Sequence, residues 1–121
     1  MNLIEEWAQA KSLGPVNNPR RFAVTFDAVR VHLVEVHPGQ LAIEARLCDL
    51  PVAPNQRERS VERIMAIGLG RARDSAHHVM LDEHRSAYWL QRRLPPGTQV
   101  PELDTAVEEL VNDVELWRNA L

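Results

Sequence analysis

Three histidines close to two acidic residues are the first candidates for chemistry in this chain. His77, His78 and His84 lie near Asp82 and Glu83. No two of them have the i, i+4 helical spacing or the order of a known metal-ligand motif, and the adjacent His77 and His78 would point to opposite faces of a strand. A metal or catalytic site in this segment is one hypothesis. Polar side chains at strand ends are the interpretation that we favour.

The other reactive side chains lack the neighbours that catalysis requires. Cys48, the single cysteine, has no adjacent basic or histidine residue and ends a predicted strand, which favours a buried and inert thiol. Gly68 and Gly70 come at the end of a predicted helix, whereas phosphate-binding glycine loops precede a helix. We therefore expect no enzyme activity, no metal site and no cofactor.

The composition is that of one small domain, spanning residues 1–121. The chain is 45% hydrophobic and 26% charged, and only six residues are aromatic. One cysteine allows no intrachain disulfide, and the first residues lack the basic and apolar regions of a signal peptide. No apolar run approaches the roughly 20 residues of a membrane span. We expect a cytoplasmic protein without membrane insertion.

The charges are unevenly distributed around a formal net charge of −3. Residues 57–93 contain eight Arg against five acidic residues, which is +3, and residues 100–121 contain six acidic residues against Arg118, which is −5. The field of an acidic terminal helix would oppose phosphate groups. Nucleic acid is therefore a poor candidate partner, and the contrast favours protein partners.

Hydrophobic periodicity predicts the elements. An apolar stripe containing Leu3, Ile4, Trp7 and Ala8 predicts a first helix, with Asn2 as its cap. Alternating apolar residues then predict three strands, over 22–26, 29–36 and 41–47, and the short connections between them predict an antiparallel meander.

The second half of the chain predicts two helices and two more strands. The ranges are a helix from 55 to about 69, strands near 79–81 and 88–90, and a helix over 103–121 with apolar residues spaced by four and three. The fold class is α+β: helix, three strands, helix, two strands, helix, with the helices packed on a twisted antiparallel sheet.

One predicted strand is apolar on both sides. Leu33 faces one side, and Val34 and Val36 face the other. Such a strand is either covered twice, by helices on both faces of the sheet, or offers one face to a partner. Both interpretations are open from the sequence. Five arginines on and after the middle helix have two interpretations as well, as a solvated rim or as the rim of an interface: Arg57, Arg59, Arg63, Arg71 and Arg73.

The order of these elements resembles a known family. The chain is similar to the small acidic chaperones of type III protein secretion, the Tir-chaperone-like (class I) group. The resemblance covers nearly the whole chain and rests on five loose phrases: the first helix ending at Leu13-Gly14, Phe26-Asp27 followed by Val29–Leu33, Leu47–Pro51 before the middle helix, Val79–Glu83, and the acidic helix Leu103–Trp117.

The resemblance implies a function. It implies a bacterial cytoplasmic homodimer that binds the N-terminal segment of a secreted effector in extended form and keeps it secretion-competent, without a cofactor. The residues that it implies for effector binding are Trp7, Phe26, Val31, Leu33, Val34 and Leu47. Those that it implies for the dimer interface are Val61, Ile64, Met65, Leu69 and Trp89.

The sequence departs from the family pattern in two places. Asp27-Ala28 replaces a frequent Asp-Gly turn, and Gly68 and Gly70 interrupt what is often a continuous helix. An extended ligand loses much conformational entropy on binding, so it needs several apolar pockets and hydrogen bonds from a strand edge. The alternative function is a chaperone-like fold that serves as a regulatory or scaffolding module outside secretion.

Overall fold

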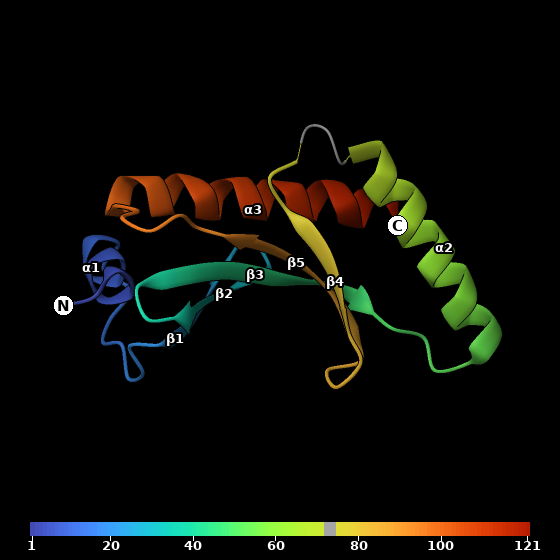
Figure 1. Cartoon of the computed structure of the whole chain (residues 1–121), viewed down its shortest axis with the longest axis horizontal. Helices are drawn as coiled ribbons and strands as arrows, with labels where there is room; N and C mark the ends of the chain where they lie inside the picture. The colour runs from blue at the N-terminus through green and yellow to red at the C-terminus, as the bar shows by residue number, and fades with distance from the viewer. Residues whose placement is uncertain (72–74) are drawn as a thin grey trace.

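The chain folds as three helices and one five-stranded sheet, in the predicted order (Figure 1). The computed structural model describes residues 1–71 and 75–121. The α+β class predicted from the periodicity is confirmed. The elements are α1 (Leu3–Ala10), β1 (Arg21–Phe26), β2 (Val29–His37), β3 (Gln40–Asp49), α2 (Pro54–Arg71), β4 (His78–Asp82), β5 (Ala87–Arg93) and α3 (Val100–Ala120).

The sheet is antiparallel throughout and has two distinct faces. The strand order is β1-β2-β3-β5-β4, so β1 and β4 are the edge strands. Side chains of residues that lie directly opposite each other on paired strands share a face. The inner face, which we define as the face toward α3, includes Val31, Leu33, Ile43, Ala45 and Leu90. The outer face includes Ala23, His32, Val34, Glu44 and Trp89.

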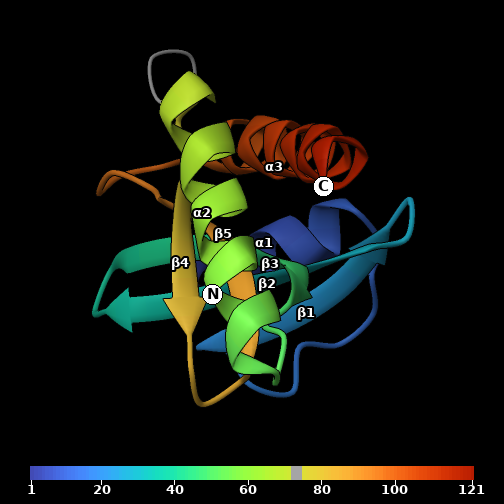
Figure 2. The ribbon, with the colours of Figure 1, turned by 90° about the vertical axis from the view of Figure 1, so that its right-hand side faces the viewer.

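The hydrophobic core lies between the inner face and two helices. Figures 1 and 2 show α3 running along one side of the sheet, with α1 beside its first half. The predicted stripe of α3 is confirmed, because its apolar residues are buried against the sheet. α1 adds Ile4 and Trp7, which are 1% and 0% exposed, and the predicted cap is present, since Asn2 Oδ1 accepts the N–H of Glu5 at 2.9 Å.

The outer face is covered by side chains and not by a helix in the described part of the chain. In Figure 1 the three helices lie on the inner side or at one end of the sheet. Trp89 is nevertheless only 5% exposed, because the guanidinium of Arg85 lies over its ring and His32 meets the ring edge-on. Of the two interpretations of the doubly apolar strand, the structure supports the one in which helices cover a single face.

Helix α2 is continuous across the glycines that were expected to interrupt it. It runs through Gly68 and Gly70 to Arg71, two residues beyond the expected end near Leu69. A Cβ atom at Gly68 would lie 3.8 Å from the ring of Trp117, which is ordinary van der Waals contact. The packing of α2 against α3 therefore leaves room for a Cβ atom at this position and does not depend on glycine.

A buried carboxylate connects the end of α2 to α3. Asp113 is 6% exposed and forms an ion pair with Arg71. Its Oδ2 also accepts the hydroxyl of Ser75 at 3.0 Å and lies 2.8 Å from Nδ1 of His77. Burial lowers the pKa of His77 to about 4, and the nearby cations Arg92 and Arg71 act in the same direction. His77 is therefore neutral at pH 7 and donates its Nδ1 proton to Asp113.

This burial predicts a pH dependence of stability. The unfolded chain protonates His77 near its ordinary pKa of 6.5, and the folded chain does so only near 4. The free energy of unfolding should therefore fall by about 3 kcal/mol as the pH decreases from 7 to 4, because the unfolded state binds the additional proton. Urea denaturation across this range should show a shallower decline in His77→Gln. An equal decline in both proteins would contradict this role of His77.

Candidate functional site

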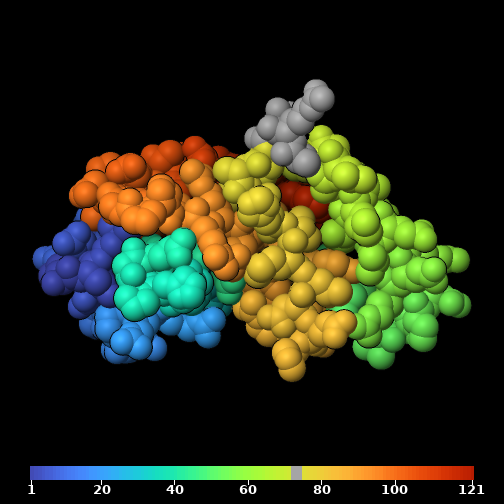
Figure 3. Space-filling model, viewed as in Figure 1, coloured from blue at the N-terminus to red at the C-terminus, as the bar shows by residue number. Residues whose placement is uncertain are grey.

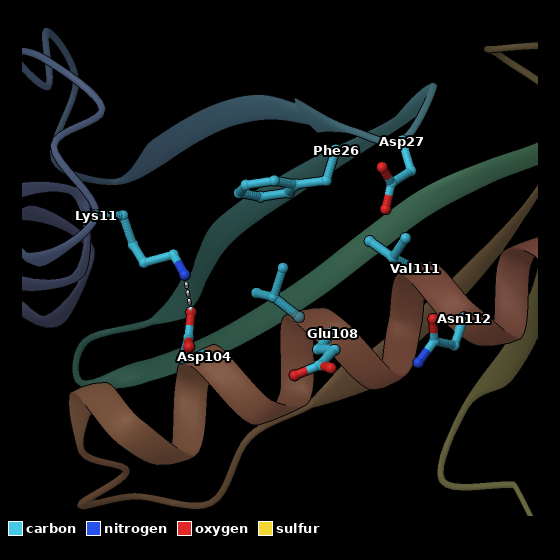
Figure 4. A pocket seen from close by; sticks show the side chains of 8 residues that line it. Lys11, Phe26, Asp27, Asp104, Glu108, Val111 and Asn112 are labelled. Atoms are coloured by element: carbon cyan, nitrogen blue, oxygen red, sulfur yellow. Dashed lines mark ion pairs between the residues drawn. The ribbon is translucent and has the colours of Figure 1, made fainter.

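A groove with an apolar floor and a charged rim lies between α3, the β1–β2 turn and the end of α1. Its volume is about 240 Å³. Figure 4 shows Phe26 directed over it from the end of β1 and Val111 rising toward it from α3. We call it the α3 groove. Its floor consists of Phe26, Val107 and Val111, and its rim consists of Lys11, Asp27, Asp104, Glu108 and Asn112.

The local sequence determines how each wall of this groove forms. Val107 and Val111 are one helical turn apart, so they share one side of α3. Phe26 is the last residue of β1, and its ring packs edge-on against Trp7 at a centroid distance of 6.0 Å. The turn that follows places both Asp27 and Ala28 at positive φ, 49° and 65°. Left-handed backbone is unfavourable for alanine, and the structure keeps this turn in the conformation that Asp-Gly would adopt more easily.

The rim of the α3 groove is acidic. Lys11 Nζ lies 3.0 Å from Asp104 Oδ1, and the indole N–H of Trp7 donates to the same oxygen at 3.2 Å. The hydrogen bond from Lys11, aided by that from Trp7, lowers the pKa of Asp104. Among the described residues, Asp27 and Glu108 have no basic group within ion-pair distance. The three carboxylates outweigh Lys11, which leaves a net charge of −2 around an apolar floor.

The six predicted effector-binding residues do not form one surface. Trp7, Val31, Leu33 and Leu47 are at most 4% exposed and belong to the hydrophobic core under α1 and α3. A partner could reach them only by displacing these helices. Phe26 lies at the α3 groove, and Val34 lies on the outer face.

Phe26 is the one predicted site residue that lines the α3 groove, and the other two residues of its apolar floor were missed. Val107 and Val111 line the α3 groove and are 4% and 5% exposed. Val107 belongs to the predicted stripe of the last helix, and Val111 broadens that stripe by one position. The sequence did contain a signal for these two residues, because the apolar stripe of the last helix is wider than packing against one sheet requires.

The five predicted dimer residues also separate into different places. Met65 and Leu69 are one turn apart on α2 and are 60% and 78% exposed. Ile64, on the other side of the helix, is 5% exposed and packs with Val61 against the protomer's own core. Trp89 lies on the outer face, beneath Arg85. Only Met65 and Leu69 present apolar side chains to solvent, and we call these two residues the α2 patch.

The arginines of α2 bind mainly within their own protomer. Arg57 lies 3.6 Å from Glu83, Arg63 donates to the carbonyl of Ala120 at 3.1 Å, and Arg71 pairs with Asp113. The prediction for Arg73 falls outside the described residues. Arg57, Arg63 and Arg71 are therefore neither fully solvated nor free to pair with a partner subunit.

The histidines considered for a metal site are separated. His77 is buried beside Asp113, whereas His78 is exposed on β4. Within residues 1–71 and 75–121, no group of three or more His, Cys, Asp or Glu side chains is placed to hold a metal ion. The described helices include none with the length and apolarity to span a membrane.

Residues 2–118 match the model of the Tir chaperone protein (CesT) family. The match covers almost the entire chain. The protein belongs to the Tir chaperone family. The resemblance inferred from the order of the sequence phrases is therefore confirmed. A search of curated proteins finds no match.

Solved structures show the same fold as this Tir chaperone family member. A chain of the HopA1–SchA chaperone–effector complex has a TM-score of 0.73 at 18% identity, with 97% of this chain and 91% of that chain covered. The Yersinia pestis type III secretion chaperone SycH, in complex with a fragment of YscM2, gives 0.68 at 21% identity, with 95% and 96% covered. The ExoU–SpcU complex of Pseudomonas aeruginosa gives 0.71 at 14% identity, with 98% and 97% covered.

The rim of the α3 groove generates a stability prediction. Replacing Asp104 with Ala should lower the free energy of unfolding by about 1–3 kcal/mol, because the indole N–H of buried Trp7 loses its acceptor. Glu108→Ala is the matched control on the same rim, with an expected change within about 0.5 kcal/mol. Urea denaturation measures both variants, and equal losses would show that Asp104 does not hold α1 to α3.

Proposed function

We propose that the protein is a cytoplasmic, homodimeric, single-domain chaperone without catalytic activity or cofactor. Its ligand is the N-terminal segment of a secreted effector, which it binds in extended form and keeps soluble and secretion-competent. Membership of the Tir chaperone family and the fold shared with chaperone–effector complexes support this function. The observation that carries it in this chain is the α3 groove, which opens beside the free edge of the sheet.

An apolar groove alone would bind an extended chain weakly. Ordering a flexible segment costs about 1–2 kcal/mol of backbone entropy per residue, so one buried side chain cannot offset the ordering of several residues. Backbone hydrogen bonds along a strand edge supply a second source of affinity that does not depend on the ligand's sequence. The groove and an edge strand together fit the requirements of an extended ligand.

The free edge of β1 provides those hydrogen bonds. The N–H of Glu35 on β2 donates to the carbonyl of Arg20 at 2.9 Å. Because hydrogen-bonded pairs alternate along an antiparallel ladder, the backbone groups of Ala23 and Thr25 are directed away from β2. No strand among the described residues pairs with that edge. An effector strand could therefore align along β1 and place one apolar side chain in the groove next to Phe26, where β1 ends.

The α2 patch supports the homodimer. Met65 and Leu69 form an apolar pair on a helix whose opposite side packs against its own protomer. β4 lies beside α2 in Figures 1 and 2, and their yellow and green surfaces adjoin in the space-filling view of Figure 3. β4 carries another exposed apolar residue, Leu81, which is 42% exposed. Apolar side chains on adjacent elements at one end of the molecule are a typical centre for an interface between identical subunits.

Co-expression tests the chaperone function. The N-terminal segments of proteins encoded beside this gene are co-expressed with it, and at least one should become soluble and co-purify. Asn112→Phe fills the α3 groove from its exposed rim, and Ala23→Pro removes an N–H from the free edge of β1. Each should reduce the affinity for that segment at least about tenfold, or 1.4 kcal/mol.

The control for this experiment is Glu115→Phe. Glu115 is exposed on α3 and does not line the groove. The control variant therefore adds the same aromatic side chain to the same helix, but outside the groove. If Glu115→Phe and Asn112→Phe reduce the affinity for the effector segment equally, the α3 groove is not the binding site. If no segment co-purifies with the unmodified protein, the chaperone function itself is contradicted.

Introducing a negative charge into the α2 patch tests the dimer. Met65→Asp or Leu69→Asp should give monomers in light scattering, because association would bury an unpaired carboxylate. Ile64→Asp is a poor test, since Ile64 is buried in the protomer and its replacement would disturb folding. Leu116→Asp is the matched control, because Leu116 is 55% exposed on α3. A dimer unaffected by both α2 variants would place the interface elsewhere.

A further inference from the structure

The outer face of the sheet contains a hollow that the proposed effector groove does not use. Its volume is about 690 Å³, and it lies on the face opposite α3. Residues from β1, β2, the end of β4, the β4–β5 turn and β5 contribute to it, so the hollow extends across the width of the sheet. We call it the outer hollow. It is lined by Arg21, Ala23, His32, Asp82, His84, Arg85 and Trp89.

The central side chain of the outer hollow is held rigidly. The guanidinium of Arg85 lies 3.7 Å from the centroid of the Trp89 ring. Its Nη1 donates to Glu44 at 3.0 Å, and its Nε donates to Asp82. Glu44 is 5% exposed and also accepts from Gln91 at 3.1 Å. An arginine fixed by two carboxylates and an aromatic ring loses little side-chain entropy when a ligand binds beside it.

The charges around the outer hollow are divided between its two sides. The protein has a net charge of −3, but both nearby carboxylates are engaged by Arg85. Arg21 is exposed, and among the described residues it has no carboxylate within ion-pair distance. Burial lowers the pKa of His32, with Glu44 opposing and Arg30, Arg21 and Arg85 adding to the effect, so His32 contributes no charge at pH 7. The unpaired positive charge of the hollow is therefore that of Arg21, on its β1 side.

The floor of the hollow holds an unused hydrogen-bond donor. Only 5% of Trp89 is exposed, and its indole N–H has no acceptor among the described residues. The nitrogen is enclosed by protein atoms, so a ligand does not contact it directly. A ligand that packs over Trp89 changes the surroundings of this N–H, which makes it a reporter for binding. Tryptophan and arginine together are also the residue types most enriched at the energetic centres of protein interfaces.

We propose that the outer hollow binds a carboxylate-bearing, extended segment of a protein partner. An Asp or Glu side chain of that segment would pair with Arg21, because Arg85 is already engaged by Asp82 and Glu44, and neighbouring apolar atoms would contact Ala23 and the surface above Trp89. A protein fits better than a nucleic acid, because the floor is apolar and the acidic α3 opposes a polyanion. The proposal is independent of the α3 groove, whose acidic rim favours the opposite charge.

Peptide binding tests this proposal directly. The probe is a short fluorescein-labelled Gly/Ser peptide with alternating Asp and Val residues, compared with versions in which Asn or Lys replaces Asp. Fluorescence anisotropy on the full-length protein should show at least about tenfold tighter binding of the Asp peptide than of either version. Arg21→Glu should abolish this preference. Arg59→Glu, an equal charge change on exposed α2, should leave it unchanged.

A spectroscopic measurement identifies the face that binds. Binding of the Asp peptide should shift the NMR resonance of the Trp89 indole N–H, while those of Trp7 and Trp117 stay in place. Four results would overturn the proposal: no preference for the Asp peptide, equal losses in Arg21→Glu and Arg59→Glu, competition by an oligonucleotide, or an Arg21→Glu protein that becomes monomeric because a second copy occupies this face. None of these results depends on whether an effector segment binds the α3 groove.

Discussion

The packing of α3 along the inner face of the sheet is the contact on which the rest of the structure depends. α3 supplies eight buried residues, and the strands beneath it supply most of the remaining core. Because this contact uses only one face of the sheet, the other face must be covered by its own side chains or by a partner. The same helix forms one wall of the α3 groove and carries Asp113, which fixes the end of α2. The core and the proposed effector site therefore share one element.

Two buried carboxylates fix the segments that do not pack directly between α3 and the sheet, namely the end of α2 and the β4–β5 turn. Asp113 joins the end of α2 and the approach to β4 through Arg71, Ser75 and His77. Glu44 joins the β4–β5 turn to the centre of the sheet through Arg85. Burying an unpaired charge is costly, and a buried pair contributes little net stability unless its hydrogen bonds are complete. Both carboxylates have several partners, so their main effect is to fix the position of α2 and of the β4–β5 turn.

The sequence was sufficient for the order of the elements but not for the site. Periodicity locates elements because apolar spacing reflects which side is buried, and the stripe of α3 followed from it. The cap at Asn2 followed from the residue type and its spacing from Glu5. Exposure of individual residues did not follow, because it depends on which neighbour covers each face. Leu33 and Val34 differ by one position, yet one lies in the core and the other on the outer face. The contact of Arg85 with Trp89 joins a turn to a strand face, and no local spacing in the sequence indicates it.

The charge distribution explains why the net charge alone gave little information about partners. The acidic residues of α3 lie on the helix side of the sheet, where Asp104 and Glu108 border the α3 groove. On the opposite side, Arg21, which has no carboxylate partner in the part of the chain that the structure describes, borders the outer hollow. A partner that crosses both surfaces would need basic or neutral residues near the groove and acidic residues near the hollow. Such opposite preferences on opposite faces would determine the direction and register in which an extended chain binds, because a reversed chain would bring like charges together.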